Sequence, residues 1–193
     1  SEYTWRHATP YLMSRDDSGM ACAMGVSTAG LLLSYERVTD APDKAAIATL
    51  MSAGSCSESE AWESELRYLR ALRTGNSAEA RDARIAQRRA HATTARRQYE
   101  AWQRMVRHYG APKDGCPVLK DASDELAWLS GNLAGSSAVQ HDRAAGGIVN
   151  VPLDIPKHAA RGIRCLDSKT WFGVPLALEA SIWLGIPGSA PEG

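Results

Sequence analysis

The residues of this 193-residue chain that could carry out acid–base chemistry are five scattered histidines and a short run of glutamates. A catalytic nucleophile needs a neighbouring base and a third group that orients that base. His141 and Asp142 are the one adjacent His/Asp pair in the sequence, and neighbours in a helix point to different faces. We therefore expect a helix cap or a surface ion pair there. The glutamates lie at an expected helix start, where they complement the helix dipole (Glu58, Glu60, Glu63 and Glu65).

Motifs of the common enzyme classes are missing from the sequence. It has no G-x-S-x-G element, and the glycines of "AAGG" at 144–147 lack the ending and the preceding strand of a phosphate loop. The repeated E-x-x-H motif of di-iron helical proteins is missing as well. The sequence therefore predicts a protein that is not an enzyme, with no cofactor and no bound metal. An enzyme built from dispersed residues would instead need perturbed carboxylates or histidines clustered in a cleft.

Four cysteines are spread along the chain without a CxxC pair, so zinc-binding and thioredoxin-like sites are only weakly indicated. An even number of separated cysteines favours two structural disulfides, formed in an oxidising compartment. Three connectivities are open to four cysteines. We favour Cys22–Cys56 with Cys116–Cys165, because each bond then closes a loop within one half of the chain. Four buried free thiols in a cytosolic protein are the alternative.

The charge balance of the chain excludes some partners. Acidic and basic residues number 22 each, so no strong field attracts nucleic acid or an anionic membrane surface. No stretch reaches the roughly 20 apolar residues that a membrane span needs. We therefore expect no nucleic-acid partner, and membrane association only through a lipid anchor.

Apolar spacing predicts helices along the first part of the chain. Five residues at helical spacing indicate a helix over 19–38 (Met20, Met24, Leu31, Tyr35 and Val38). A short helix follows and is expected to end at Gly54. Ser57 and Glu60 form a capping box, which predicts that a new helix starts there. The large apolar residues of that helix are expected to face inward (Trp62, Leu66, Leu69 and Leu72).

The longest predicted element is a helix over about 77–109, which at about 1.5 Å per residue would be about 50 Å long. Its apolar stripe alternates steps of three and four in its second half (Ile85, Ala92, Ala95, Tyr99, Trp102, Val106 and Tyr109). Its other face carries a series of arginines (Arg81, Arg84, Arg88, Arg96, Arg104 and Arg107). We favour a solvated face for this series over a surface that binds phosphates or headgroups.

The sequence as a whole predicts an all-α fold. Further helices are expected over about 123–142, 156–166 and 170–185, which gives an array or bundle of about six or seven helices, stapled by disulfides. We expect a single helical domain over 1–193, with two similar halves at about 19–110 and 116–187. In these halves "CSESEAW" (56–62) and "CLDSKTW" (165–171) echo each other. We interpret both as a helix start tethered by its cysteine, with Asp167 or Ser168 as the second cap; duplication and chance explain the echo equally well.

Two expected helices carry little side-chain volume, around Gly25–Gly30 and Gly131–Ser137. Close packing of backbones, with the aromatic residues in the core, is the favoured interpretation. The alternative is an apolar gap that a ligand fills, since small-molecule sites are apolar pockets with a few polar groups. Seven residues are the candidates for lining such a gap (Tyr35, Trp62, Tyr99, Trp102, Trp128, Leu133 and Trp171).

One segment resembles a known repeat family. "LRYLRALRTGNSAEARDARIAQRRA" at 66–90 is similar to the turn of a tetratricopeptide repeat, with Gly75-Asn76 between two helices and Ala80 and Ala83 in the second. The match covers one repeat, and the second helix is much longer than in the family. In architecture and composition the chain also resembles TatT-type periplasmic lipoproteins associated with TRAP transporters, and the helical component of bacterial sterol transport.

These resemblances imply a function in transport. They imply a non-enzymatic periplasmic carrier or adaptor that binds a lipid-like hydrophobic molecule, for example a sterol, in a cavity between helices. They also imply a soluble periplasmic binding protein of the transport system as partner, and a lipid anchor at the outer membrane. The alternative is a tetratricopeptide-like scaffold that binds a periplasmic protein or peptide. A solvent-open groove would favour the scaffold, and a closed cavity would favour the carrier.

Overall fold

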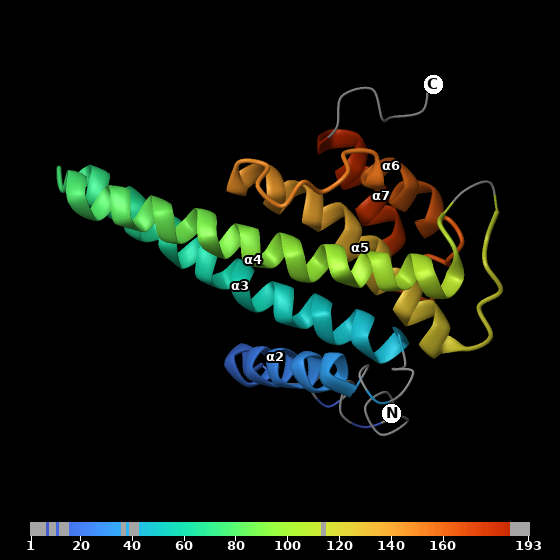
Figure 1. Cartoon of the computed structure of the whole chain (residues 1–193). Helices are drawn as coiled ribbons and strands as arrows, with labels where there is room; N and C mark the ends of the chain where they lie inside the picture. The colour runs from blue at the N-terminus through green and yellow to red at the C-terminus, as the bar shows by residue number, and fades with distance from the viewer. Residues whose placement is uncertain are drawn as a thin grey trace.

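The computed structural model describes residues 7, 11, 16–35, 38, 43–112 and 115–185 of the chain. In these residues the protein is all-α, which confirms the predicted fold class. The six helices are α2 (Ser18–Tyr35), α3 (Asp43–Arg73), α4 (Ser77–Tyr109), α5 (Ala122–Ala145), α6 (Ile155–Ile163) and α7 (Val174–Gly185). A long α3–α4 hairpin runs through the molecule, with α2 on one side and α5, α6 and α7 on the other (Figure 1).

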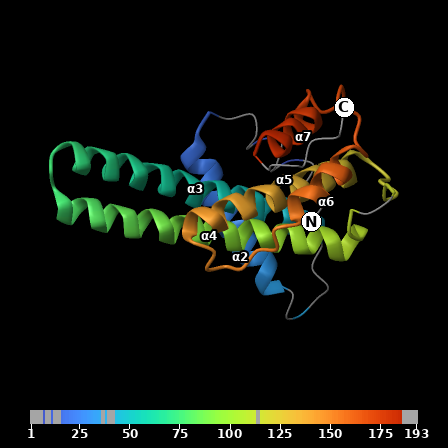
Figure 2. The ribbon, with the colours of Figure 1, turned by 90° about the horizontal axis from the view of Figure 1, so that it is seen from above.

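The distal end of the α3–α4 hairpin projects beyond all the other helices, as both views show (Figures 1 and 2). Asn76 begins α4, because its side-chain oxygen accepts the backbone N–H of Glu79 at 3.1 Å. Alanines with less than a tenth of their surface exposed line the two helices of the hairpin (Ala61 and Ala71 in α3, Ala80 and Ala83 in α4). Small side chains let the two backbones approach closely, so the distal hairpin is narrow and its large side chains point elsewhere.

The predicted helix break between Gly54 and Ser57 is wrong, because α3 is continuous from Asp43 to Arg73. Gly54 is a packing residue: a Cβ there would lie 2.7 Å from Cγ of Gln98 on α4. The Ser57 hydroxyl donates to the Gly54 carbonyl at 2.9 Å and accepts from the Thr94 hydroxyl at 2.8 Å. Ser57, the expected cap residue, therefore contacts α4 inside the hairpin instead of beginning a helix.

Helix α2 packs on α3 through its small residues, and its predicted apolar stripe faces outward. A Cβ at Gly25 would lie 2.9 Å from Cβ of Ser52, and Ala29 is buried. The larger residues of the predicted stripe are exposed instead; Leu31 is 60% exposed and Tyr35 56%. The helical spacing was correctly predicted but the buried face was not, because close backbone approach at Gly25 decides which face packs.

Both favoured disulfides are present, which confirms the predicted connectivity. Cys22–Cys56 joins α2 to the middle of α3, and Cys116–Cys165 joins the α4–α5 connection to the residues after α6. The sequence separations are 34 and 49 residues. In the chain-entropy description, loops of this size stabilise the fold by roughly 4 kcal/mol each.

The arginine series of α4 is not uniformly solvated, because Arg104 is only 2% exposed. Its guanidinium bonds to Glu100 at 2.9 Å and to Asp43 at 3.4 Å, so it ties α4 to the start of α3. The other five arginines are exposed, as predicted. Ile85 of the predicted apolar stripe is also exposed, near the start of α4.

The last helix begins later than predicted, at Val174. The Asp167 carboxylate accepts hydrogen bonds from the Thr170 hydroxyl and from the backbone N–H groups of Thr170 and Lys169. The hydroxyl bond first, and then the two backbone bonds, lower the pKa of Asp167. Residues 168–173 are turns that end at Gly173, whose φ is 81°. The echo is therefore wrong as a repeated helix start, since "CSESEAW" lies inside α3 and "CLDSKTW" leads into a turn. The tethering cysteine is confirmed in both.

Candidate functional site

Two of the seven predicted ligand-binding residues are core residues. Trp102 is 6% exposed and Trp128 1%, and the Trp128 indole N–H donates to the Gly162 carbonyl at 2.7 Å. The small residues of α5 contact these large side chains directly: a Cβ at Gly135 would lie 2.4 Å from the Trp102 ring. Around Gly131–Ser137 the small residues therefore serve close packing, which was the favoured interpretation.

The other five residues lie at the margin of the core or on the surface. Tyr99, Leu133 and Trp171 are half-buried against the core, and the Trp171 indole N–H donates to Glu125 at 2.8 Å. Tyr35 and Trp62 are each 56% exposed, on α2 and α3. The structure thus places the predicted residues in the core, at its margin and on the surface. Trp62 lies one helical turn after Ser59, which lines a groove on α3.

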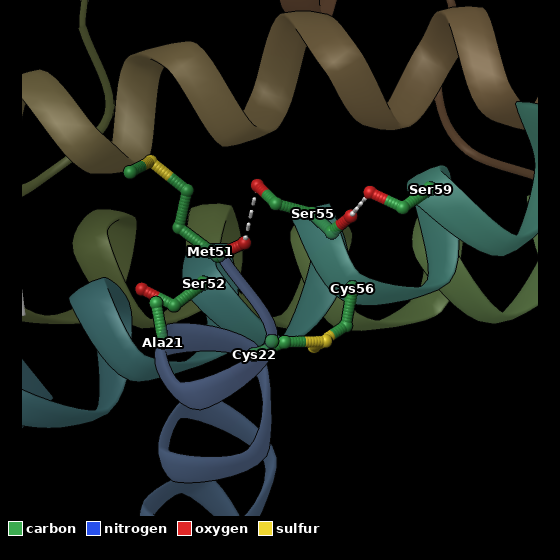
Figure 3. Close-up of a pocket in the computed structure, with 8 residues that line it drawn as sticks. Ala21, Cys22, Met51, Ser52, Ser55, Cys56 and Ser59 are labelled. Carbon is green, nitrogen blue, oxygen red and sulfur yellow. Dashed lines mark hydrogen bonds between the residues drawn. A yellow bond between two sulfur atoms is a disulfide. The ribbon is translucent and has the colours of Figure 1, made fainter. Parts of the chain in front are cut away.

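A groove of about 350 Å³ lies where α2 crosses α3, with the Cys22–Cys56 disulfide in its wall (Figure 3). Its lining comes from both helices (Gly19, Ala21 and Cys22 of α2; Met51, Ser52, Ser55, Cys56 and Ser59 of α3). The lining serine hydroxyls bond back to carbonyls of their own helix: Ser55 donates to Met51 at 3.3 Å and Ser59 to Ser55 at 3.2 Å. Because these donors are already used, the groove presents mainly apolar surface.

The groove continues along α3 as a row of exposed apolar side chains. Trp62, Leu66 and Leu69 follow Ser59 at steps of three and four, and they are 56%, 45% and 52% exposed. We name this surface the α3 outer face (Met51, Ser55, Ser59, Trp62, Leu66 and Leu69). The opposite side of α3 is buried against α4. From its first to its last residue the face is about 27 Å long at about 1.5 Å per residue.

Charges divide the α3 outer face into two halves. The exposed charged residues of α3 near the body of the molecule are acidic (Glu60, Glu63 and Glu65), and those toward the hairpin tip are basic (Arg67, Arg70 and Arg73). Arg67 is paired with Glu79 across the tip at 2.6 Å. Because the two ends of the apolar row carry opposite charges, a partner with complementary charges is expected to bind in one orientation.

A buried pair of histidines joins α3, α4 and α5, and sequence reasoning missed it. The Nδ1 atoms of His91 and His141 lie 2.8 Å apart, and His141 Nε2 lies 3.2 Å from a Glu58 carboxylate oxygen. The prediction of a cap or a surface ion pair is wrong for His141, which is 6% exposed. Asp142 is buried too and accepts the backbone N–H groups of Val149 and Val151, so it holds the loop after α5.

The inward position of His141 could have been found from sequence. It follows the buried Ala134 and Ala138 at helical steps of four and three, so it shares their face of α5. Its partner is 50 residues away, and no local pattern links the two. In the pair, one Nδ1–H donates a hydrogen bond to the other Nδ1. The Glu58 carboxylate is positioned to accept a hydrogen bond from Nε2 of His141. Burial lowers the pKa of His91 and the nearby His141 lowers it further, which favours the neutral form of His91.

The described residues contain no cluster of three or more histidines, cysteines or acids suited to a metal ion. Over the same residues, none of the helices has the length and apolar character needed to cross a bilayer.

Comparison with known proteins gives no relative: no protein-family model, no curated protein and no solved structure matches the chain. The resemblances to tetratricopeptide hairpins and to periplasmic transport proteins therefore stay predictions.

Proposed function

We propose that this protein is a non-enzymatic helical interaction module, which binds an amphipathic α-helix of a protein partner along the α3 outer face. The observation that carries the proposal is the row Trp62, Leu66 and Leu69, each about half exposed on a hairpin that projects from the body. Monomeric proteins expose single apolar side chains commonly, but contiguous apolar patches mark interaction surfaces.

The geometry of the face favours a helix as the bound element. Side chains at steps of three and four form a straight apolar row, and an amphipathic helix presents a matching row at the same spacing. Tryptophan and arginine are among the residues that most often dominate the binding energy of an interface, and this face carries Trp62 with Arg70 at its edge. This proposal corresponds to the predicted interaction scaffold, with an outward face of the hairpin as the binding surface.

Site-specific photocrosslinking in the protein's native cells tests this proposal. A benzophenone amino acid at Leu69 is expected to give a crosslinked product of discrete size, with its attachment site on the apolar face of a helix. The same amino acid at Ile85, which is 50% exposed on α4, is the control and is expected to give no such product. If Leu69 crosslinks no more than Ile85, or if its products map to non-helical segments, the proposal is wrong.

A second candidate function is the predicted carriage of a lipid-like molecule such as a sterol, and the groove favours it. Its volume of about 350 Å³ lies in the range of small-molecule sites, and its serines leave an apolar lining. Native mass spectrometry with lipid extracts should then detect a bound apolar species. The Ser55→Trp variant, which fills the groove, should lose that species, whereas Ser34→Trp on the exposed end of α2 should keep it. Binding that survives Ser55→Trp would exclude the groove as the site.

A further inference from the structure

The chain itself carries an amphipathic helical segment, the distal part of α3. Between the crossing of α2 at Cys56 and the hairpin turn at Gly75, α3 contacts α5 near the start of this stretch, where Glu58 lies 3.2 Å from His141. Closer to the tip, no described helix lies along its outer side in either view (Figures 1 and 2). This segment is amphipathic, with alanines and serines toward α4 and Trp62, Leu66 and Leu69 on the outside. An equivalent segment from another copy has the helical spacing that the proposed function requires of a partner.

The length of this segment suits an antiparallel pairing. Its midpoint lies between Glu65 and Leu66, so a two-fold axis there would overlap the two segments along their whole length, about 28 Å at about 1.5 Å per residue. Trp62 of one copy would then lie opposite Leu69 of the other, and the two Leu66 side chains would meet near the axis. Beyond that overlap, each hairpin tip would reach the α2 crossing of the other copy.

The charges favour the same orientation. Because acidic residues occupy the lower half of the segment and arginines the half near the tip, antiparallel pairing places opposite charges together. Parallel pairing would place like charges together. Glu63 and Arg70 are two helical turns apart on one edge of the outer face, and both are exposed. In antiparallel copies Glu63 would lie within two residues of the level of Arg70, about 3 Å along the helix, which these long side chains can span. Two-fold symmetry would repeat this pair.

We propose that the protein forms a two-fold symmetric homodimer, in which the α3 outer faces of two copies pack antiparallel around Leu66. The inference rests on the proposed function and names the partner helix as α3 of a second copy. The four helices of the two hairpins would then form a bundle, with Trp62 and Leu69 covered and Glu63 and Arg70 on its rim.

Sedimentation equilibrium across about 1 to 500 µM protein tests the dimer. The native chain is expected to sediment as a dimer within this range. Leu66→Glu would place two like charges near the axis of an apolar contact, and it is expected to weaken association by at least about 100-fold. Ile85→Glu on the far side of α4 is the matched control and is expected to dimerise like the native chain. Circular dichroism of both variants verifies that the helices remain.

A charge exchange tests the antiparallel order. Glu63→Arg and Arg70→Glu should each weaken self-association about ten-fold, because each replaces two attractive contacts by repulsive ones. Mixing the two variants should restore a heterodimer, since every charge at these two positions would then face a charge of opposite sign on the other copy.

A monomeric native chain, or variants that do not restore each other, would overturn the homodimer. If the chain is monomeric but its Leu69 crosslinks to another protein's helix, the dimer fails and the proposed function stands.

Discussion

Replacing Gly135 by alanine is expected to lower the free energy of unfolding by about 2–3 kcal/mol, although only one methyl group is added. A Cβ at this position would lie 2.4 Å from the Trp102 ring and 2.9 Å from Ile155. Both neighbours are buried, so the ring cannot turn away into solvent, and α5 would have to move off α4. Urea unfolding followed by far-UV circular dichroism measures the change.

Gly30 provides the matched control for that substitution. It also lies inside a helix, but no atom lies within 4 Å of the position a Cβ would take. Gly30→Ala should therefore raise the free energy of unfolding by about 0.5–1 kcal/mol, because alanine restricts the unfolded chain and favours the helix. Equal unfolding midpoints for Gly135→Ala and the native protein would show that α5 and α4 are not in close contact at Trp102.

The second large effect is a loss of stability in mild acid, caused by the buried histidine pair. The pKa of His91 is lowered from its ordinary value of 6.5 by burial first and by His141 second. Arg84 lowers it further, whereas Glu65 and Glu58 act in the opposite direction. The unfolded chain therefore binds a proton at His91 more readily than the folded chain does.

The sign of the pH effect follows from that difference in proton binding. The contribution of His91 to stability is fully present well above pH 6.5 and falls as the pH drops below 6.5, until the pH passes the lowered folded-state pKa. The steepest loss for one proton is about 1.4 kcal/mol per pH unit. Urea unfolding between pH 7.5 and pH 4.5 is expected to show this slope in the native protein, and a flatter slope in His91→Gln.

His158 is the control for the acid effect, because its side chain is 34% exposed on α6 and lies outside the pair. His158→Gln should keep the native slope. Asp124 acts in a separate window: burial would raise its pKa, but bonds from Lys44, the Lys120 N–H and Tyr109 outweigh burial and lower it. Its contribution is lost only as the pH falls below 3.8, so it does not alter the slope near pH 6. A native-like slope in His91→Gln would rule out His91 as the titrating group.

Local patterns predicted the elements of this fold well. The helix over 77–109 and both disulfide pairings follow from apolar spacing, turn residues and the even distribution of cysteines, all of which are local or countable. The choice of buried face was predicted less well. In α2 and in the distal part of α3 the large apolar residues were expected inside, but Gly25, Ala61 and Ala71 pack there because small residues let backbones meet.

The candidate site could not be predicted because it depends on how helices are placed. Trp62 was predicted as a ligand-binding residue, yet its exposure depends on α3 running on past Gly54, where a helix end was expected. The groove needs α2 to cross α3 at Cys56, a contact between segments 34 residues apart. His91 and His141 are 50 residues apart in the sequence, and they meet only because α4 and α5 pack side by side. Spacing within one helix contains none of this information.

The Cys22–Cys56 bond also changes what happens when α2 detaches. Without the bond, α2 would be joined to α3 only through residues 36–42 of the chain, whereas the bond adds a second link in the middle of α3 and so raises the effective concentration of α2 at its docking site. Undocking of α2 is then a local and reversible opening, in which the wall of the groove swings away and returns to the same place. Under reducing conditions that restraint is lost, and the groove keeps its wall only as long as the contacts at Gly25 and Ala29 hold.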